Sequence, residues 1–557
     1  MNAKSDTEGH QERATSVGDA ARPRWRFVLA GTTTATACLL VLIAILAPNQ
    51  LGRLTPYAFV RIPIEALLGT ALLLVLPARP RRVVAVLAGA LLGLLLVLKI
   101  VDVGFFMVLA RPFDPILDWT FLRAGTDFLT ESYGRAAAIA AVVAAVLLVL
   151  VVLVLVTLAV LRVARIVVAH ERTATRTVAV LTLAWAACAV LGAHIVPGVP
   201  IAADTVASAA HDRAVQVRAG LRDHEVFAAQ TADDAFRDTP ADRLLTGLRG
   251  KDVVVSFVES YGRVAVEDPE LAPRVDALLD AGTGRLRAAG FASRSAFLTS
   301  PTAGGGSWLA HATLLSGVWA DNQQRYNDLV RGDRTTLNGA FRRAGWRTVM
   351  MMPALTQDWP EAGFFASDQI YGADDVGYRG PKFSFAPMPD QYTLSAFERL
   401  ERSRTDRPPL MAEIPLVSSH APWTPVPEMV DWDDVGDGSV FAPMASTADA
   451  EDTESRETSR VRADYRHSIE YSLNSLISYV ETYGDDNLVL VFLGDHQPSP
   501  LVTGEGASRD VPITIVARDP AVLDRISDWG WQDGLNPDPK APVWPMDTFR
   551  DRFLRAF

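Results

Sequence analysis

Apolar residues in the first 200 positions run in long segments that polar residues rarely interrupt. Each segment is close to or above the roughly 20 residues that cross a hydrocarbon core of about 30 Å. The stretch over residues 142–156 is almost wholly Ala, Val and Leu. We therefore predict an N-terminal five-helix transmembrane bundle within residues 27–199, with spans at Phe27–Leu46, Ala58–Leu76, Val83–Ala110, Ala136–Leu161 and Thr177–Val196.

Basic residues flank these segments unevenly, and the imbalance predicts an orientation. Cytoplasmic loops of membrane proteins carry an excess of Lys and Arg. We therefore expect residues 1–26 to be a cytoplasmic tail of a multi-pass cell-membrane protein, and everything after about residue 200 to be extracytoplasmic. The clusters that support this are Lys4, Arg13, Arg22, Arg24 and Arg26, then Arg79, Arg81 and Arg82, then Arg162, Arg165, Arg172 and Arg176.

Charged residues near the end of the third segment allow two interpretations. Lys99 and Asp102 are spaced i, i+3 and can neutralise each other as a structural ion pair in the bundle. Alternatively, Asp102 lies near the outer surface with the Arg-Pro-Phe-Asp turn of residues 111–114 and shapes an entrance for a lipid headgroup. The sequence leaves both interpretations open.

The pattern changes after residue 246, where short apolar runs alternate with amphipathic segments. Such alternation favours a mainly parallel sheet with helices on both faces. We predict an extracytoplasmic α/β/α sandwich over residues 246–557, joined to the membrane block by linker helices in residues 200–245. The expected strands are Val253–Val258, Phe291–Leu298, Arg347–Met352, Leu410–Val417, Leu488–Leu493 and Ile513–Val516.

Reactive residues follow three of the predicted strands. Glu259 ends the first strand, a Gly-rich loop leads to Ser307, and Asp495-His496 follows a late strand. Ligands in open α/β sheets bind beyond the carboxyl ends of strands. Two carboxylates, an imidazole and a hydroxyl are suitable ligands for a divalent cation. Taken alone, Ser307 would be interpreted as a helix N-cap, but its placement with the others favours a metal site.

Charge and cysteine content narrow the range of functions. The net charge of −11 argues against nucleic acid as a partner, because phosphate binding needs clustered Lys and Arg. Both cysteines, Cys38 and Cys188, fall inside apolar segments. A disulfide-stapled domain and a cysteine metal site are therefore excluded.

Three motifs resemble the alkaline-phosphatase/sulfatase superfamily. They are Val-Ser-Phe-Val-Glu-Ser-Tyr-Gly at 255–262, Gly-Gly-Ser-Trp-Leu-Ala-His-Ala-Thr-Leu-Leu-Ser-Gly at 305–317 and Phe-Leu-Gly-Asp-His at 492–496. With the membrane anchor, the chain is similar to lipoteichoic-acid synthases and lipid A phosphoethanolamine transferases. The resemblance implies an alkaline-phosphatase-like fold, metal ligands Glu259, Ser307, Asp495 and His496, catalytic residues Ser307 (the nucleophile) and His420, and substrate-binding residues Trp359, His311 and His420.

The resemblance also implies a function. It suggests a metal-dependent phosphotransferase that moves a phospho-headgroup from a membrane phospholipid to a lipid or cell-envelope glycan through a phosphoserine-type intermediate. One Mn²⁺, or else Zn²⁺, would be the cofactor. Two alternatives remain, a hydrolase of phosphate or sulfate esters and a non-catalytic surface receptor on the same fold.

Two departures from the family patterns refine this expectation. Sulfatases carry Pro and Arg two and four residues after the nucleophile, where this chain has Leu309 and His311. We therefore expect an unmodified serine at position 307, and His311 either stands in for the sulfatase Arg or is a histidine packed on its helix. Glycerolphosphate polymerases carry Arg two residues after a pocket Trp, but Trp359 is followed there by Glu361. This difference argues against a glycerolphosphate headgroup.

Overall fold

The computed structural model describes residues 24–445 and 458–557, apart from residues 120, 122, 124, 127, 128 and 131–133. Two compact units make up the chain. The helical unit contains the residues up to 47 together with 55–97 and 148–207. The sheet unit contains residues 48–54, 98–147 and 208–557. The sheet unit therefore includes segments between the predicted membrane spans, and also the end of the third predicted span and the start of the fourth.

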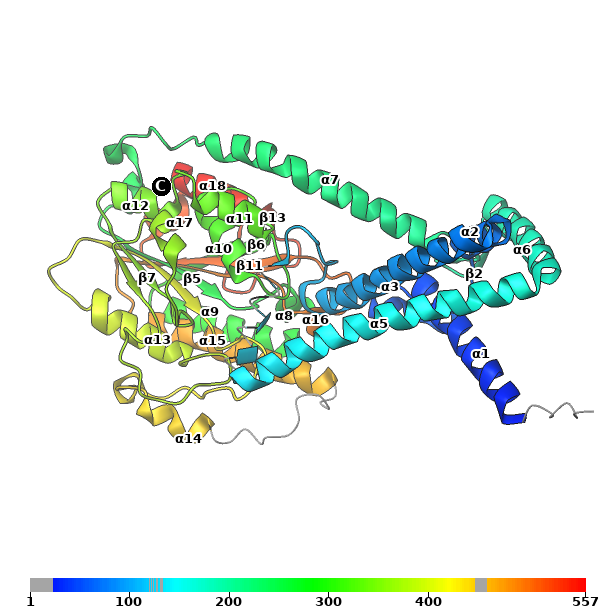
Figure 1. The fold of residues 1–557 in the computed structure, drawn as a ribbon. Coiled ribbons are helices and arrows are strands. Elements are labelled where there is room, and N and C mark those ends of the chain that lie inside the picture. The colour runs from blue at the N-terminus through cyan, green and yellow to red at the C-terminus, as the bar shows by residue number, and fades with distance from the viewer. Residues whose placement is uncertain are drawn as a thin grey trace, which may run out of the picture. The chain divides into compact units, whose positions relative to one another are not determined.

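Four helices in the described part of the chain are long and apolar enough to cross a membrane. They are α1, α3, α5 and α6, and α2 is a shorter apolar helix (Figure 1). Their bounds are α1 Arg24–Leu46, α2 Ile64–Val75, α3 Ala78–Leu109, α5 Arg135–Ala169 and α6 Glu171–Leu191.

The second predicted span, Ala58–Leu76, differs from what the structure contains. Helix α2 has only 12 residues, which gives a length of about 18 Å at 1.5 Å per residue. Proline lacks a backbone N–H and interrupts helices. Here Pro56 opens the 3-10 turn η2 (Pro56–Phe59), and Pro63 ends the short strand β1 (Ile62–Pro63), which pairs in parallel with β4 (Ala202–Ala203). The apolar run is therefore divided into a turn, a strand and a short helix.

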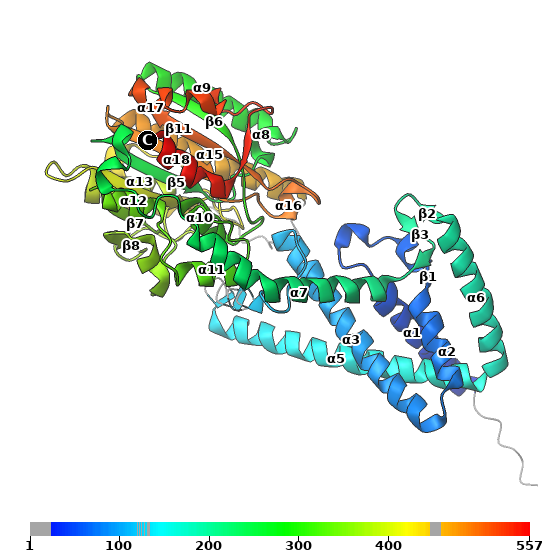
Figure 2. The same ribbon diagram turned by 90° about the horizontal axis from the view of Figure 1, so that it is seen from above.

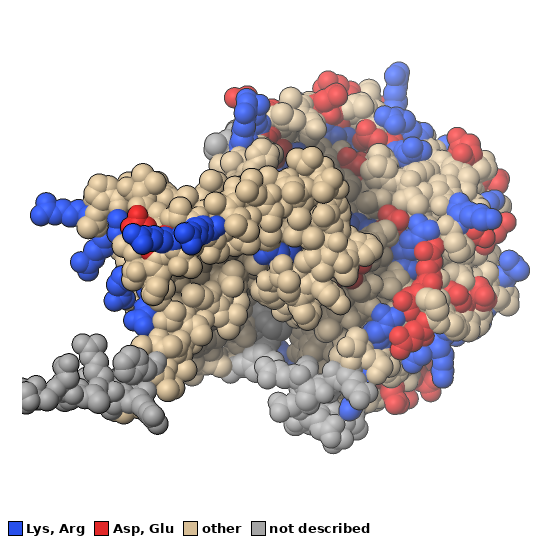
Figure 3. Space-filling view, turned by 90° about the vertical axis from the view of Figure 1, so that its right-hand side faces the viewer, with Lys and Arg blue, Asp and Glu red and all other residues tan. Residues whose placement is uncertain are grey.

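Small residues let two of the long helices approach closely within the helical unit. A Cβ atom added to Gly89 of α3 would lie 2.7 Å from the Cα of Thr157 in α5. One turn later, the same addition at Gly93 would lie 3.2 Å from the Cα of Leu153. Contacts of this kind are typical of helices packed in membranes. Figure 3 shows that the exposed surface of the long helices is mostly free of Lys, Arg, Asp and Glu.

The sheet unit is built on a nine-stranded mixed sheet with the order β12-β6-β11-β10-β5-β9-β7-β8, in which β13 also pairs with β6. Strands β10, β5, β9, β7 and β8 are mutually parallel, and β11 runs antiparallel to both of its neighbours. Central strands rich in Val, Ile and Leu suit burial on both faces. The bounds are β5 Asp252–Val258, β6 Ala292–Thr299, β7 Arg347–Met351, β8 Gln369–Tyr371, β9 Leu410–Leu416, β10 Leu488–Gly494, β11 Asp510–Ala517, β12 Gln532–Asp533 and β13 Val543–Pro545.

Helices flank this sheet in two groups (Figures 1 and 2). Helix α10 packs with α11, α12 and α18, while α15 packs with α9 and α13. The six predicted strands are all present. Because five adjacent strands of the sheet are mutually parallel, its mainly parallel character is also confirmed. The helix bounds are α7 Thr205–Ala232, α8 Val264–Glu267, α9 Ala272–Ala288, α10 Ser307–Ser316, α11 Gln323–Val330, α12 Leu337–Arg343, α13 Asp390–Phe397, α14 Ala442–Ala445, α15 Thr458–Tyr483, α16 Pro500–Thr503, α17 Pro520–Asp524 and α18 Phe549–Ala556.

Strand pairing places three chain segments at one edge of the sheet. Strands β5 and β10 are adjacent and parallel, and Val258 pairs with Gly494 at their carboxyl ends. Glu259 and Asp495 are therefore neighbours. A parallel bridge between Ala303 and Gln497 ties the Gly-rich loop to the segment that follows β10.

Within the sheet unit, buried carboxylates hold the end of α3 and the segment that follows it in place. Asp102 accepts hydrogen bonds from the Arg213 guanidinium and from the backbone N–H of Phe113. Asp118 forms an ion pair of 2.6 Å with Arg111, and Asp114 accepts a hydrogen bond of 2.7 Å from Gln216. These contacts place Asp102 in a network with the 111–118 turn, and the headgroup entrance remains a hypothesis.

Candidate active site

Ser307 is the first residue of α10 and follows a loop whose backbone favours glycine. Gly306, which precedes it, has φ 80°, and Gly304 has φ +72°. A Cβ on Gly304 would lie 1.6 Å from the carbonyl oxygen of Val108, so the loop backbone packs directly against the end of α3. The first N–H groups of a helix lack intrahelical partners and attract anions. The hydroxyl of Ser307 therefore lies where a phosphoryl group would be stabilised.

The Ser307 hydroxyl contacts residues from two other strand ends. Its Oγ donates to Oε2 of Glu259 at 3.1 Å and lies 3.2 Å from Nε2 of His496. Nε2 of His496 in turn lies 3.4 Å from Oε1 of Glu259 and 3.5 Å from Oδ2 of Asp495. The four residues implied as metal ligands are thus brought together.

Backbone donors and one strained residue hold the two carboxylates in place. Oδ1 of Asp495 accepts the N–H of Ser260 at 2.8 Å and the N–H of His496 at 2.7 Å. Ser260 has φ 57°, a conformation that costs a non-glycine residue energy and is often found at functional sites. Its hydroxyl donates to Oε1 of Glu259 at 2.9 Å. Ser260 was not predicted as a site residue, although it adjoins Glu259 in the sequence.

The donor set fits one divalent cation. Ligand atoms of Glu259, Asp495 and His496 lie within 4.8 Å of one another, and all three residues are buried. Nδ1 of His496 lies 2.8 Å from the carbonyl oxygen of Gln497, an acceptor that places the proton on Nδ1 and leaves the Nε2 lone pair for a metal. This arrangement is usual for histidine ligands. Oxygen and nitrogen donors suit Mn²⁺ or Zn²⁺.

Without a cation, the buried carboxylates of Glu259 and Asp495 repel each other. Burial, together with the Glu259 carboxylate, raises the pKa of Asp495 to about 6. Burial also opposes ionisation of Glu259, but the neighbouring His496 and His420 outweigh it and lower the pKa of Glu259 to about 2. Glu259 therefore ionises easily, whereas Asp495 keeps its proton up to a higher pH. A divalent cation between them would relieve this repulsion.

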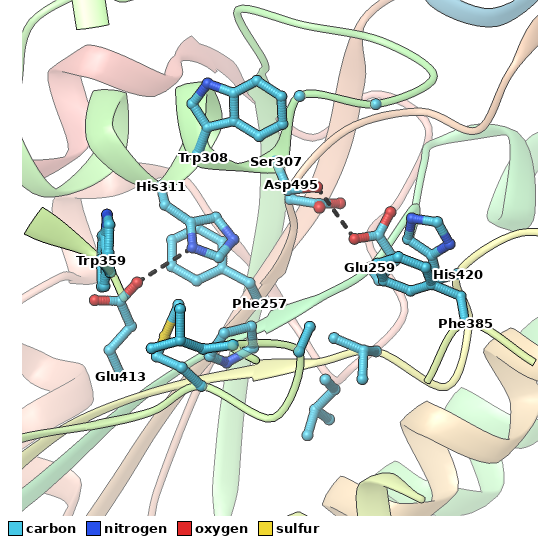
Figure 4. A pocket seen from close by; sticks show the side chains of 18 of the residues that line it. Phe257, Glu259, Ser307, Trp308, His311, Trp359, Phe385, Glu413, His420 and Asp495 are labelled. Atoms are coloured by element: carbon cyan, nitrogen blue, oxygen red, sulfur yellow. Dashed lines mark hydrogen bonds and ion pairs between the residues drawn. The ribbon is translucent and has the colours of Figure 1, made fainter. Parts of the chain in front are cut away.

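A cavity of about 340 Å³ opens beside Ser307 and is lined mostly by apolar side chains. Figure 4 shows Ser307, Asp495, Glu259 and His420 on one side of it, and His311, Glu413 and Trp359 on the other. The lining residues are Phe257, Glu259, Gly305, Gly306, Ser307, Trp308, His311, Tyr326, Met352, Ala354, Leu355, Trp359, Phe365, Phe385, Glu413, Pro415, Leu416, Val417, His420 and Asp495. All seven predicted site residues except His496 line this cavity, and His496 contacts Ser307 directly.

His420 follows β9 on a loop that buried hydrogen bonds keep in position. The Asp390 carboxylate accepts the N–H groups of Val417 and Ser418 at 2.8 and 2.9 Å. Burial raises the pKa of Asp390. The His420 ring stacks on Phe385 with centroids 3.7 Å apart, and its Nδ1 lies 2.6 Å from the carbonyl oxygen of Ala421. This contact leaves Nε2 for a substrate in the cavity.

His311 contacts a residue that the sequence analysis missed. Its Nδ1 lies 3.2 Å from Oε1 of Glu413 on β9, and its ring stacks on Phe257 at 3.8 Å. A Glu inside the otherwise apolar run of β9 was the available signal. Thr302 carries the nearest other hydroxyl in the Gly-rich loop. This hydroxyl donates to the carbonyl oxygen of Gly305 at 2.5 Å and so stabilises the loop conformation.

No protein-family model matches this chain, and no curated protein does. Among solved structures, the chain is similar to the integral membrane lipooligosaccharide phosphoethanolamine transferase A from Neisseria meningitidis, with 13% identity, 94% of this chain and 95% of that chain covered, and a TM-score of 0.43. It is also similar to the lipoteichoic acid synthase from Listeria monocytogenes, with 14% identity, 51% and 69% coverage and a TM-score of 0.34. The phosphoglycerol transferase from Streptococcus pyogenes matches with 12% identity, 60% and 90% coverage and a TM-score of 0.34.

Proposed function

We propose that this chain is a metal-dependent membrane phosphotransferase. It takes a phospho-headgroup from a membrane phospholipid and passes it to a lipid or cell-envelope glycan, through a phosphoserine-type intermediate on Ser307. The supporting observation is the Ser307 hydroxyl, which lies at a helix N-terminus and within 3.2 Å of both Glu259 and His496. The N-cap of α10 is Gly306, not Ser307, so helix capping does not account for the position of this hydroxyl.

The proposed architecture follows the same interpretation. Residues 27–199 anchor the protein in the cell membrane with a cytoplasmic N-terminus, and residues 246–557 form an alkaline-phosphatase-like α/β/α catalytic domain outside it. This placement requires an odd number of crossings, so the short helix α2 has to count as the fifth. The apolar helices α1, α3, α5 and α6 support a membrane location. A lipid donor suits such an anchor better than a soluble ester does, because one span would be enough to tether a domain.

Glu259, Asp495, His496 and the Ser307 hydroxyl would hold one Mn²⁺ or Zn²⁺. Such an ion, when bound, lowers the pKa of a ligated hydroxyl and offsets negative charge on phosphoryl oxygens. Side chains of the protein carry out the remaining steps. Ser307 Oγ releases its proton to solvent and bonds to phosphorus, while the bond from phosphorus to the diacylglycerol oxygen breaks. His420 faces the cavity and is the candidate donor of the proton that this leaving oxygen takes up.

The second half of the reaction reverses these roles. An acceptor hydroxyl gives its proton to His420 and bonds to phosphorus, the bond from phosphorus to Ser307 Oγ breaks, and Ser307 takes a proton from solvent. Water in place of the acceptor would make the protein a hydrolase. The α10 N-terminus stabilises the phosphoryl oxygens in both halves.

Mass spectrometry of the Ser307 peptide tests this proposal. The full chain in detergent, loaded with Mn²⁺, is incubated with bacterial membrane lipids and then digested. We expect a mass increase equal to one phospho-headgroup on Ser307 in the wild type and none in Ser307→Ala. Thr302→Ala is the matched control and should keep the adduct. An adduct that persists in Ser307→Ala but disappears in Thr302→Ala would refute the assignment of the nucleophile.

A further inference from the structure

A second cavity in the sheet unit lies beside the Gly-rich loop and has no part in the steps described above. It has a volume of about 650 Å³ and is formed by three segments, the loop after α1, the end of α3, and α16 with the residues that follow it. Figures 1 and 2 both show α16 beside the end of α3. All the lining residues belong to the sheet unit. They are Gln50, Leu51, Gly52, Arg53, Phe106, Met107, Ala110, Pro500, Leu501, Glu505 and Gly506.

Leu501 in the wall of this cavity is exposed, which is rare in this part of the chain. Within the described residues 233–445 and 458–557, only two large apolar side chains are exposed, Leu501 at 49% and Val543 at 41%. Leu501 shares the cavity with Leu51 and Met107, which are exposed as well. A grouped apolar surface marks an interaction site, whereas a single exposed apolar residue needs no explanation. Val543, on strand β13, is therefore a matched control for Leu501.

The length of α3 indicates what covers this apolar surface. The helix has 32 residues, which gives about 48 Å at 1.5 Å per residue, whereas a hydrocarbon core is about 30 Å thick. The basic residues Arg79, Arg81 and Arg82 mark the cytoplasmic interface at its start, so the extra length lies at its other end. Residues 104–109 there are still apolar. A surface that continues the apolar face of a membrane helix suits the acyl chains of a lipid.

Polar side chains in the same cavity suit the ester groups of a lipid. Its charged lining residues are Arg53 and Glu505. The Glu505 carboxylate accepts the backbone N–H of Gly52 at 2.9 Å and so joins the segment after α16 to the loop after α1. The guanidinium of Arg53 and the amide of Gln50 supply hydrogen-bond donors. Ester carbonyl oxygens accept such hydrogen bonds without bringing a charge into the cavity.

The cavity adjoins the loop that carries the nucleophile. Val108 and Ser499, which directly adjoin lining residues in the sequence, both contact this loop. A Cβ on Gly304 would lie 1.6 Å from the carbonyl oxygen of Val108 and 3.3 Å from the Cα of Ser499. Gly304 is three residues before Ser307, so their Cα atoms are at most about 11 Å apart. A lipid in this cavity would therefore have its headgroup end close to the nucleophile.

We propose that this cavity binds the diacylglycerol part of the donor phospholipid. The acyl carbons nearest the glycerol lie against Leu51, Met107 and Leu501, and the ester carbonyl oxygens accept hydrogen bonds from Arg53 and Gln50. The proposal rests on the proposed function, which supplies the lipid donor. It adds that the donor is recognised by its two acyl esters, whatever its headgroup. No bond is made or broken in this cavity.

Photolabelling of the full-length, Mn²⁺-loaded protein tests whether a lipid occupies the cavity. Nanodiscs of phosphatidylethanolamine and phosphatidylglycerol contain a trace of each lipid with a diazirine close to one acyl ester, and mass spectrometry locates the label. We expect label on residues 500–506 and 48–54. Leu501→Asp should lower it about tenfold, because contact with one partly buried leucine is lost. Leu501→Phe, which keeps the surface apolar, and Val543→Asp should both retain the label.

The rate of Ser307 adduct formation tests whether the bound lipid is the donor. With a long-chain phospholipid, Leu501→Asp should slow the reaction about tenfold. With a short-chain phospholipid below its critical micelle concentration, the same variant should slow it much less, because few acyl carbons reach Leu501. Val543→Asp should match the wild type with both lipids.

Two results would overturn the proposal. One is wild-type protein that is labelled on α3 but not on residues 500–506, since any lipid around a membrane helix labels α3. The other is equal slowing of long-chain and short-chain donors by Leu501→Asp, which would reveal a structural effect instead of lipid contact. A wild-type protein that is labelled in the cavity but forms no Ser307 adduct would refute the proposed phosphotransferase and leave the lipid site supported.

Discussion

Metal binding should weaken as the pH falls below about 6. The reason is Asp495, whose pKa is raised to about 6 by burial and by the nearby Glu259 carboxylate. A carboxyl group must lose its proton before it binds a metal. The proton and the cation therefore compete for Asp495 in a pH range that is easily reached. Glu259 does not add to this effect, because its pKa of about 2 keeps it ionised.

The size of the effect follows from the pKa. Competition at Asp495 alone reduces the apparent affinity about tenfold at pH 5 and about 100-fold at pH 4, relative to pH 7, at about 1.36 kcal/mol per unit. His496 makes the decline steeper. Burial opposes its protonation, but the Asp495 and Glu259 carboxylates raise its pKa, and a protonated Nε2 cannot bind a metal.

In the metal-free protein, the free energy of unfolding should depend on pH through the same two carboxylates. Because the pKa of Asp495 is raised from 3.8 to about 6, the folded state holds a proton that the unfolded chain has released. Asp495 therefore contributes stability that is full below about pH 4 and is lost as the pH rises through about 6. Glu259 has the opposite sign, since its lowered pKa gives stability above about pH 4.5 that is lost as the pH falls toward 2.

Calorimetric titration of the metal-free full-length protein with Mn²⁺ at pH 5, 6 and 7, at one ionic strength, measures this dependence. Repeating the pH 6 titration in two buffers with different ionisation enthalpies should detect the release of protons. Asp495→Ala, which lacks a ligand, should bind little metal at any of these values. Equal wild-type affinity at pH 5 and pH 7 would show that Asp495 is not a ligand with a raised pKa.

Three further changes test other parts of the structure. Ser307→Ala should keep the fold, with a thermal midpoint within a few degrees of wild type, because the change removes one hydroxyl hydrogen bond to Glu259, worth about 2 kcal/mol. Gly304→Ala should slow adduct formation, whereas Gly345→Ala, where a Cβ meets nothing within 4 Å despite φ +96°, should not. Arg550→Met leaves Asp234 buried and unpaired, which costs about 3–5 kcal/mol, and adding Asp234→Leu should restore much of the thermal midpoint.

The sheet and its reactive edge could be predicted because the signals are local. Buried parallel strands are continuous apolar runs, so β5 and β10 are recognisable along the chain. Glu259 and Asp495 immediately follow them. The rule that parallel strands end at one edge then brings the two carboxylates together. Ser307 adds a Gly-rich turn before a helix, which is again a local feature.

Other features depend on contacts between distant segments. The apolar run at Ala58–Leu76 has the composition of a span, but Pro63 and the pairing of β1 with β4 shorten its helix. Glu413 is only one polar residue in an apolar strand, and its meaning depends on His311, which lies about a hundred residues earlier. Periodicity along the chain carries no information about such pairs.

The close approach of the α3–α5 segment to the nucleophile loop has a practical consequence for inhibitor discovery. The Phe121 ring lies 5.5 Å from Trp308, and the Val108 carbonyl packs against Gly304. A soluble fragment that starts after the last membrane helix would lack both residues, and its Trp308 would be open to solvent. Screening against such a fragment would select compounds that stack on a surface covered in the intact protein. Full-length protein in nanodiscs is therefore the appropriate target for a screen.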